Sequence, residues 1–169
     1  MRALSPALLL LLLPACASVP DGPAPAYNVV INEFQASNTT TLPDEAGGFD
    51  DWIELFNAGE EPADLSGHYL SDDLLNPTRW PIPADTTIAA GGFVLVWADG
   101  AADGPLHANF SLAATGEEIG LFGPLTYQAE QLDAVQFEIQ AVDESMARTP
   151  DGAASWQADA TPTPEATNE

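Results

Sequence analysis

Residues 132–139 read LDAVQFEI, and this stretch indicates the fold more clearly than any other part of the chain. Val135, Phe137 and Ile139 alternate with Gln136 and Glu138. Side chains of a β-strand point alternately to its two faces, so a strand here has one dry face and one wet face. The stretch therefore predicts a β-strand that covers an apolar core.

Six further strands are predicted, because short apolar runs alternate with clusters of Gly, Pro, Asn and Asp at the spacing of an all-β domain. They are expected at residues 28–35, 52–57, 68–71, 92–98, 118–122 and 145–149. Apolar bulk lies on both faces of 52–57, which predicts a central or covered strand. No stretch shows sustained helical periodicity. Seven strands with these turns predict an all-β, two-sheet β-sandwich.

The chain has 169 residues, which is room for one domain of common size. We expect four segments along it. These are a lipoprotein-type signal peptide at 1–15, a lipidated cysteine with a Pro- and Ala-rich tether at 16–26, the sandwich at 27–160, and a Pro- and Thr-rich tail at 161–169.

The amino terminus has the features of a secretory signal peptide: Arg2, an apolar run at 7–13, and small residues after it. The apolar run is far shorter than the roughly 20 residues that span a bilayer as a helix. LPAC at 13–16 resembles a bacterial lipobox, in which Cys16 becomes the lipidated first residue. ACA at 15–17 is also an Ala-x-Ala signal, and cleavage after it would release a soluble secreted protein.

We expect lipidation, because the chain's only cysteine lies at the end of the apolar run. Ala17 and Ser18 follow the cysteine in place of the aspartate that retains lipoproteins in the inner membrane. The resemblance to lipoproteins therefore implies an exported protein of the cell envelope. It would be anchored to the outer membrane, on its periplasmic or surface face.

The charge balance is extreme, with 26 Asp and Glu against three Arg and no Lys, for a formal net charge of −23. Such a surface repels phosphate backbones and anionic lipid headgroups. We therefore expect no nucleic-acid partner, and membrane contact through the lipid anchor only. The simplest interpretation of the charge is a solvated surface that resists aggregation.

Calcium binding is the alternative interpretation, because hard cations bind oxygen ligands on flexible loops. None of the acidic loops has the spacing of an EF-hand. The candidate ligands are Asp44, Asp50, Asp51, Asp72, Asp73, Asp99 and Asp103.

Residues for catalysis are scarce. His68 and His107 are the only histidines, and neither lies near a nucleophile elbow. A zinc site needs three or four ligands, and the folded part has two histidines and no cysteine. We expect His68 to be a strand or turn residue and His107 to be a packing residue. The sequence thus predicts no catalytic residue, no cofactor and no enzymatic activity.

Glu33, Glu54 and Arg148 lie inside predicted strands among apolar neighbours. A buried charge requires a partner, and the predicted domain holds only two arginines. We expect Arg148 to pair with one of the two glutamates and to fix the register of the strands.

Several short motifs occur in a fixed order along the chain. They are INEF at 31–34 with ASN at 36–38, DWIELFN at 51–57, DLSGHYLSDD at 64–73, NPTRW at 76–80, AGG at 90–92 with VWADG at 96–100, LHANF at 106–110, and Ser145 with RTPDG at 148–152, Trp156 and TPTP at 161–164. In this order, over nearly all of 29–168, the sequence resembles a bacterial lamin-tail domain.

The resemblance implies an immunoglobulin-like β-sandwich, found in bacteria as a stand-alone exported domain or beside secreted hydrolases. We expect a non-catalytic envelope lipoprotein whose domain is structural or binds a protein or glycan of the envelope. A calcium-stabilised adhesion module and an accessory domain of a secreted hydrolase system are the alternatives.

Overall fold

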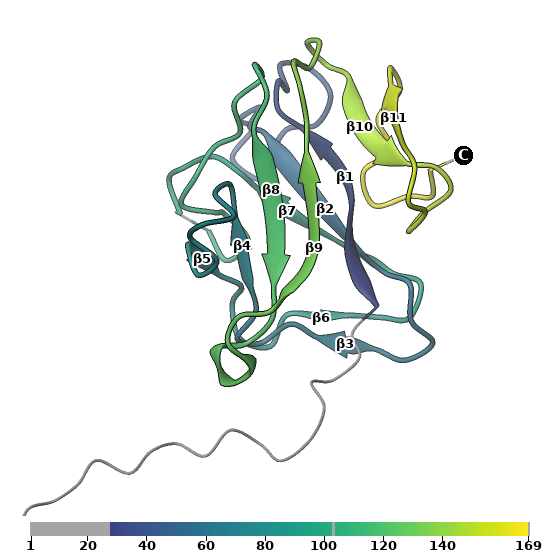
Figure 1. Cartoon of the computed structure of the whole chain (residues 1–169). Coiled ribbons are helices and arrows are strands. Elements are labelled where there is room, and N and C mark those ends of the chain that lie inside the picture. Colours follow the sequence, from purple (N-terminus) through teal and green to yellow (C-terminus); the bar gives the residue numbers. More distant parts are fainter. Residues whose placement is uncertain (1–27, 103, 169) are drawn as a thin grey trace, which may run out of the picture.

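The computed structural model describes residues 28–102 and 104–168 as two antiparallel sheets packed face to face (Figure 1). Sheet one has the order β11-β10-β1-β2-β7, and sheet two has the order β5-β4-β8-β9. A small third sheet pairs β3 with β6 at one end of the sandwich (Figure 1). The strands of sheet one are β1 (Val29–Gln35), β2 (Trp52–Asn57), β7 (Phe93–Trp97), β10 (Ser145–Arg148) and β11 (Trp156–Asp159). Those of the other sheets are β3 (Ala63–Asp64), β4 (Tyr69–Ser71), β5 (Trp80–Pro81), β6 (Thr87–Ile88), β8 (Glu118–Phe122) and β9 (Gln131–Gln136).

The predicted all-β, immunoglobulin-like sandwich is confirmed. Each of the seven predicted ranges contains or overlaps one strand, and the helical content of the described residues is a single 3-10 turn, η1 (Leu125–Tyr127). The prediction missed β3, β5, β6 and β11. The first three have two residues each, which is too short for an alternating pattern, and β11 reads WQAD, with no regular alternation of large apolar residues.

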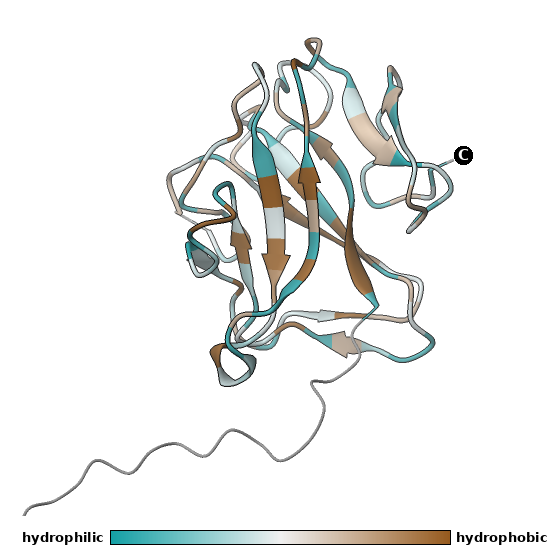
Figure 2. Ribbon diagram, viewed as in Figure 1, coloured by the Kyte–Doolittle hydropathy of each residue, from teal (hydrophilic) through white to brown (hydrophobic). Residues whose placement is uncertain are grey.

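The core lies between the two sheets. Ile31 and Phe34 of β1, Leu55 of β2, and Ile119 and Leu121 of β8 are almost completely shielded from solvent. Hydrophobic segments recur along β1, β8 and β9 (Figure 2). The predicted central position of 52–57 is also correct, because β2 pairs with β1 on one side and with β7 on the other.

A β-bulge in β1 positions the core residues of this strand. The register against β2 shifts between Ile31 and Glu33, so that Ile31 lies opposite Leu55 and Glu33 lies opposite Glu54. The extra residue changes the alternation of faces. Ile31 and Phe34 therefore both reach the core, although three positions separate them.

The prediction made from residues 132–139 is correct in part. β9 ends at Gln136, but the chain continues beside sheet two, where the amide of Phe137 donates to the carbonyl of Glu117 at 2.9 Å. Val135 is buried and Phe137 is half-buried, as the pattern predicts. Ile139 is 78% exposed, and its prediction as a core residue is wrong. It lies beyond the start of β8, where Glu118 faces Gln136.

The carboxyl-terminal segment is part of the folded unit. Residues 161–168, which composition sets apart as a tail, cross the outer face of sheet one. The amide of Thr163 donates to Glu33 at 3.2 Å, and the amide of Glu165 donates to Glu54. The segment thereby covers two carboxylates that would otherwise lie on an open sheet face.

Candidate functional site

The two sheets differ in width at one side of the sandwich. β9 is the outermost strand of sheet two and packs on β1, whose Ile31 amide donates to Asp133 of β9 at 2.9 Å. Sheet one continues past β1 with β10 and β11. These two strands therefore extend beyond the edge of sheet two, beside the upper part of β9 (Figure 1).

A groove of about 250 Å³ lies in this offset, and we call it the edge groove. It is lined by Val135, Gln136, Phe137, Glu138, Ile139, Gln140, Met146 and Trp156. One wall is thus the end of β9 and its extension, and the other is formed by side chains of β10 and β11.

Aromatic contacts hold the walls of the edge groove in place. The ring of Phe34 lies 4.7 Å from that of Phe137 and 5.5 Å from that of Trp156, measured between centroids. The Arg148 guanidinium stacks over Trp156 at 4.6 Å and also contacts both carboxylate oxygens of Asp133, at 2.9 and 3.0 Å. The Arg148–Asp133 pair therefore joins β10 to β9 beside the groove.

The strand on the groove side has a free edge. The amide of Phe137 donates a hydrogen bond to the carbonyl of Glu117, which immediately precedes β8. Successive peptide groups of an antiparallel strand point in alternate directions. Those of Gln136 and Glu138 consequently point away from β8, toward the open edge of the sheet.

A glycine allows the extension of β9 to lie close to the preceding loop. Gly116 has φ +105, and a Cβ at this position would lie 2.7 Å from the carbonyl oxygen of Phe137 and 2.9 Å from the Cα of Glu138. Only glycine fits without displacing this segment.

Acidic side chains lie along one side of the groove. Glu117, Glu118 and Glu138 line a broad, shallow depression next to it. Glu118 accepts hydrogen bonds from the amide of Leu74 and from the side chain of Gln136, and these lower its pKa. Burial raises the pKa of Glu117. The groove thus combines apolar walls, a free strand edge and an acidic rim.

The predicted calcium ligands are separated among several loops. Asp44 accepts the amides of Ala46 and Gly48 within its own loop, at 2.9 and 2.6 Å. Asp73 accepts the amide of Leu75, and Asp72 pairs with Arg79 at 2.8 Å.

The other predicted ligands also make local contacts. Asp51 accepts the amide of Leu112 at 3.2 Å, and burial raises its pKa to about 6. The backbone carbonyl of Asp50 accepts from Asn38. Asp103 lies outside the described residues. Within 28–102 and 104–168, no three Asp, Glu, His or Cys side chains are grouped to hold a metal ion, so the expected calcium ligands are not assembled there.

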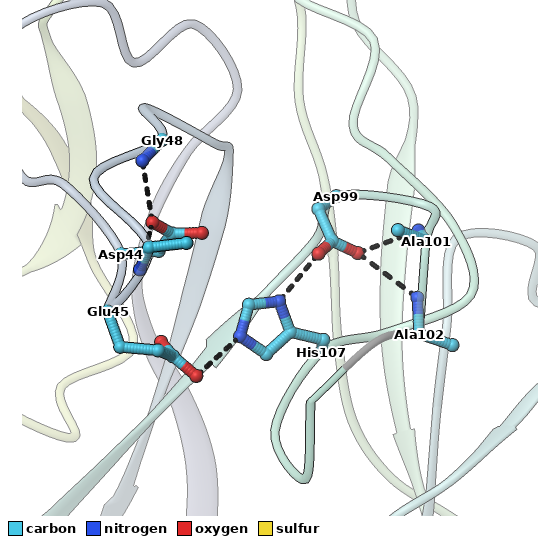
Figure 3. Close-up of polar contacts among 8 residues, drawn as sticks. Asp44, Glu45, Gly48, Asp99, Ala101, Ala102 and His107 are labelled. Atoms are coloured by element: carbon cyan, nitrogen blue, oxygen red, sulfur yellow. Dashed lines mark hydrogen bonds and ion pairs between the residues drawn. The ribbon is translucent and has the colours of Figure 1, made fainter.

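His107 was expected only to pack, yet it connects two acidic loops. Its Nδ1 lies 2.5 Å from Asp99 and its Nε2 lies 3.0 Å from Glu45 (Figure 3). Burial opposes protonation of the ring, but the hydrogen bonds to Asp99 and Glu45 outweigh it and raise the pKa of His107. We call these three residues the histidine clamp. Because both ring nitrogens contact carboxylates, the geometry suits an ionic link between loops.

The other histidine is buried in a turn. His68 precedes β4, has no exposed surface, and has its pKa lowered by burial. This agrees with the expected strand or turn residue.

The predicted pairing of Arg148 with Glu33 or Glu54 is wrong. Arg148 is buried, but its ionic partner is Asp133. Glu33 lies opposite Ala147, so Arg148, one position further along β10, points to the other face of sheet one. The glutamates are on the outer face, whereas Arg148 points between the sheets.

The two glutamates instead accept hydrogen bonds from neutral groups. Glu33 accepts from the hydroxyl of Ser145, and Glu54 accepts from the side chain of Asn32 at 3.0 Å. Burial raises the pKa of both, and that of Glu54 reaches about 8. Neither the sequence positions nor the residue types indicated that the carboxyl-terminal segment would cover them.

No membrane-spanning helix is present in the described part of the chain, since none is both long and apolar enough.

Comparison with curated proteins and with solved structures gives no match. The family model of the lamin tail domain matches residues 23–138, which include the strands from β1 to β9. Domains of this family have an immunoglobulin-like fold and are non-enzymatic. They are structural or protein-interaction modules. The chain therefore belongs to the lamin tail domain family.

Proposed function

We propose that this protein is a non-catalytic lipoprotein of the bacterial cell envelope whose lamin tail domain binds another envelope protein. The observation that carries the proposal is the edge groove. It combines a free strand edge with half-buried aromatic and aliphatic side chains, and such surfaces are typical interaction sites.

The position of the groove supports this function. β1 begins at the end of the sandwich next to β3 and β6 (Figure 1). The edge groove is near the opposite end, where Phe34 of β1 meets Phe137. With Cys16 lipidated, an anchored domain would present the groove away from its point of attachment.

The anchor is tested by the mass of the mature amino terminus. We expect a mature protein that begins at Cys16 with covalent lipid, and a Cys16→Ser variant that leaves the membrane fraction. A mature chain that begins at Ser18 without lipid would show that the protein is secreted and soluble.

The binding role is tested by site-specific photo-crosslinking in intact cells. A photoreactive amino acid replaces Ile139, which is 78% exposed beside the groove, and in a matched control it replaces Leu75, which is 93% exposed on another loop. We expect a discrete protein adduct from position 139 and none from position 75. Equal adducts from both positions would oppose a specific binding role for the groove.

A further inference from the structure

We propose that the edge groove binds an extended segment of the partner protein, with alternating basic and apolar residues, as an additional strand on β9. This inference rests on the proposed binding role and adds the mode of recognition and the chemistry of the partner. Three features of the groove support it.

The first feature is the direction of the peptide groups. Phe137 donates its amide to Glu117, which directs the peptide groups of Gln136 and Glu138 to the open edge. An added strand pairs with such groups, which is the common β-augmentation mode of peptide recognition. The edge from 136 to 139 is about 13 Å long at the usual rise of a strand.

The second feature is the surface that an added strand would cover. β10 and β11 extend past β9, so a strand beside β9 would lie against the side chains of Met146 and Trp156. Alternate side chains of a strand point to the same face. Every second residue of the bound segment would therefore be apolar and would pack on these two side chains.

The third feature is charge. Glu117, Glu118 and Glu138 line the neighbouring depression, and the whole chain has a net charge of −23. Lys and Arg on the other face of the segment would complement this rim. The same charge opposes a second copy of the protein as the occupant, because two strongly acidic surfaces repel each other.

The length of the site is limited at both ends, because the side chain of Gln140, just beyond residue 139, bonds to the backbone of Phe34 and Ala36. Arg148 and Asp133 join β10 to β9 next to the groove, at 2.9 Å. A bound segment therefore reaches the edge formed by residues 136–139 but does not continue past this ion pair. We expect a short recognition element of about four paired residues.

The test uses the full-length protein purified from cells and the probe peptide Lys-Val-Lys-Ile-Lys-Val-Lys. A second peptide of the same sequence carries N-methyl groups on alternate amides, so it keeps the charge and loses the strand pairing. Amide hydrogen exchange reports the protection of Gln136 and Glu138, and a titration gives the affinity. We expect the first peptide to protect both amides and the second to protect neither.

Two variants at one exposed position separate pairing from charge. Glu138→Pro removes an outward-pointing amide, whereas Glu138→Gln removes only the charge. We expect Glu138→Pro to weaken the probe about tenfold, as loss of a hydrogen bond does, and Glu138→Gln to weaken it less than threefold, about the effect of an exposed charge. If Glu138→Pro does not fold, amide protection in the unaltered protein still decides.

Four results would overturn the proposal. They are no binding of the probe at millimolar concentration, equal binding of both peptides, protection at sites other than 136–139, and formation of a dimer through β9 in place of peptide binding. A specific crosslink at position 139 together with any of these results would keep the binding role and reject strand addition.

Discussion

Asp133 and Arg148 join the two sheets across the edge of the sandwich. Arg148 Nη2 lies 3.0 and 2.9 Å from the two Asp133 oxygens, and Ile31 donates its backbone amide to the same carboxylate. The Arg148 and Asp133 side chains are only 9% and 15% exposed. The pair thus holds β10 beside β9 and keeps the edge groove in shape.

Loss of this pair should destabilise the fold. We expect Arg148→Met to lower the free energy of unfolding by about 3 kcal/mol, because it leaves a half-buried carboxylate without its cation. The control is Arg79→Met, which breaks the pair with Asp72; Arg79 is 36% exposed and Asp72 is 10% exposed. That change should lower stability less, because Arg79 remains partly solvated, whereas Arg148 also donates to the carbonyls of Ile31 and Ala153. Urea unfolding measures both, and equal losses would contradict the structural role of Arg148.

The histidine clamp makes stability depend on pH. The pKa of His107 is raised in the folded protein, so protonation stabilises the fold. This contribution is complete below the ordinary histidine pKa of about 6.5 and is lost as the pH rises through the folded pKa. We expect the difference in melting temperature between the wild type and His107→Gln to be larger at pH 5.5 than at pH 9. A difference independent of pH would exclude a charged clamp.

Glu54 should act in the same direction from another part of the molecule. Burial raises its pKa from 4.5 to about 8. The wild type therefore loses stability as the pH rises from about 5 through 8, whereas Glu54→Gln has no proton to lose at this position. We expect the urea midpoint of Glu54→Gln to rise relative to that of the wild type as the pH increases over this range. Glu138→Gln, at an exposed position, is the control, and its urea midpoint should change with pH in the same way as that of the wild type.

The carboxylate of Asp143 holds the loop that contains Thr39 and Thr40. Its carboxylate accepts the amides of Thr39 and Thr40 at 2.7 and 3.0 Å, and these bonds lower its pKa. Its φ of 59 is unfavourable for most side chains but tolerated by Asn. We expect faster amide exchange at Thr39 and Thr40 in Asp143→Ala than in Asp143→Asn, which keeps the backbone conformation and an acceptor. Equal exchange in both variants would show that the side chain does not hold the turn.

Gly116 and Gly47 offer a matched comparison. Both have positive φ, but a Cβ at Gly47 would meet no atom within 4 Å, whereas one at Gly116 would meet the backbone of Phe137 and Glu138. We expect Gly47→Ala to lower the free energy of unfolding by about 1 kcal/mol, as left-handed backbone strain does. Gly116→Ala should lower the free energy of unfolding further and should shift the NMR signals of residues 136–140. A smaller loss at position 116 would mean that this segment moves freely.

The sequence by itself determined seven of the eleven strands of the described chain and the nature of the fold. Alternation in 132–139, the apolar bulk on both faces of 52–57 and the turn residues between runs are local signals, and each describes its own segment of backbone. The family motifs added the order of the elements. The paired acids and histidine could not be found in this way, because contacts such as that of His107 with Glu45 join residues far apart in sequence.

Only the tertiary structure decided which side chains meet. The bulge between Ile31 and Glu33 and the pairing of β1 with β10 place Arg148 on the opposite face from Glu33, where Asp133 is its partner. The different widths of the sheets likewise create the edge groove. Register and sheet order depend on packing between distant segments, and a shift of one residue reverses the face of every side chain in a strand.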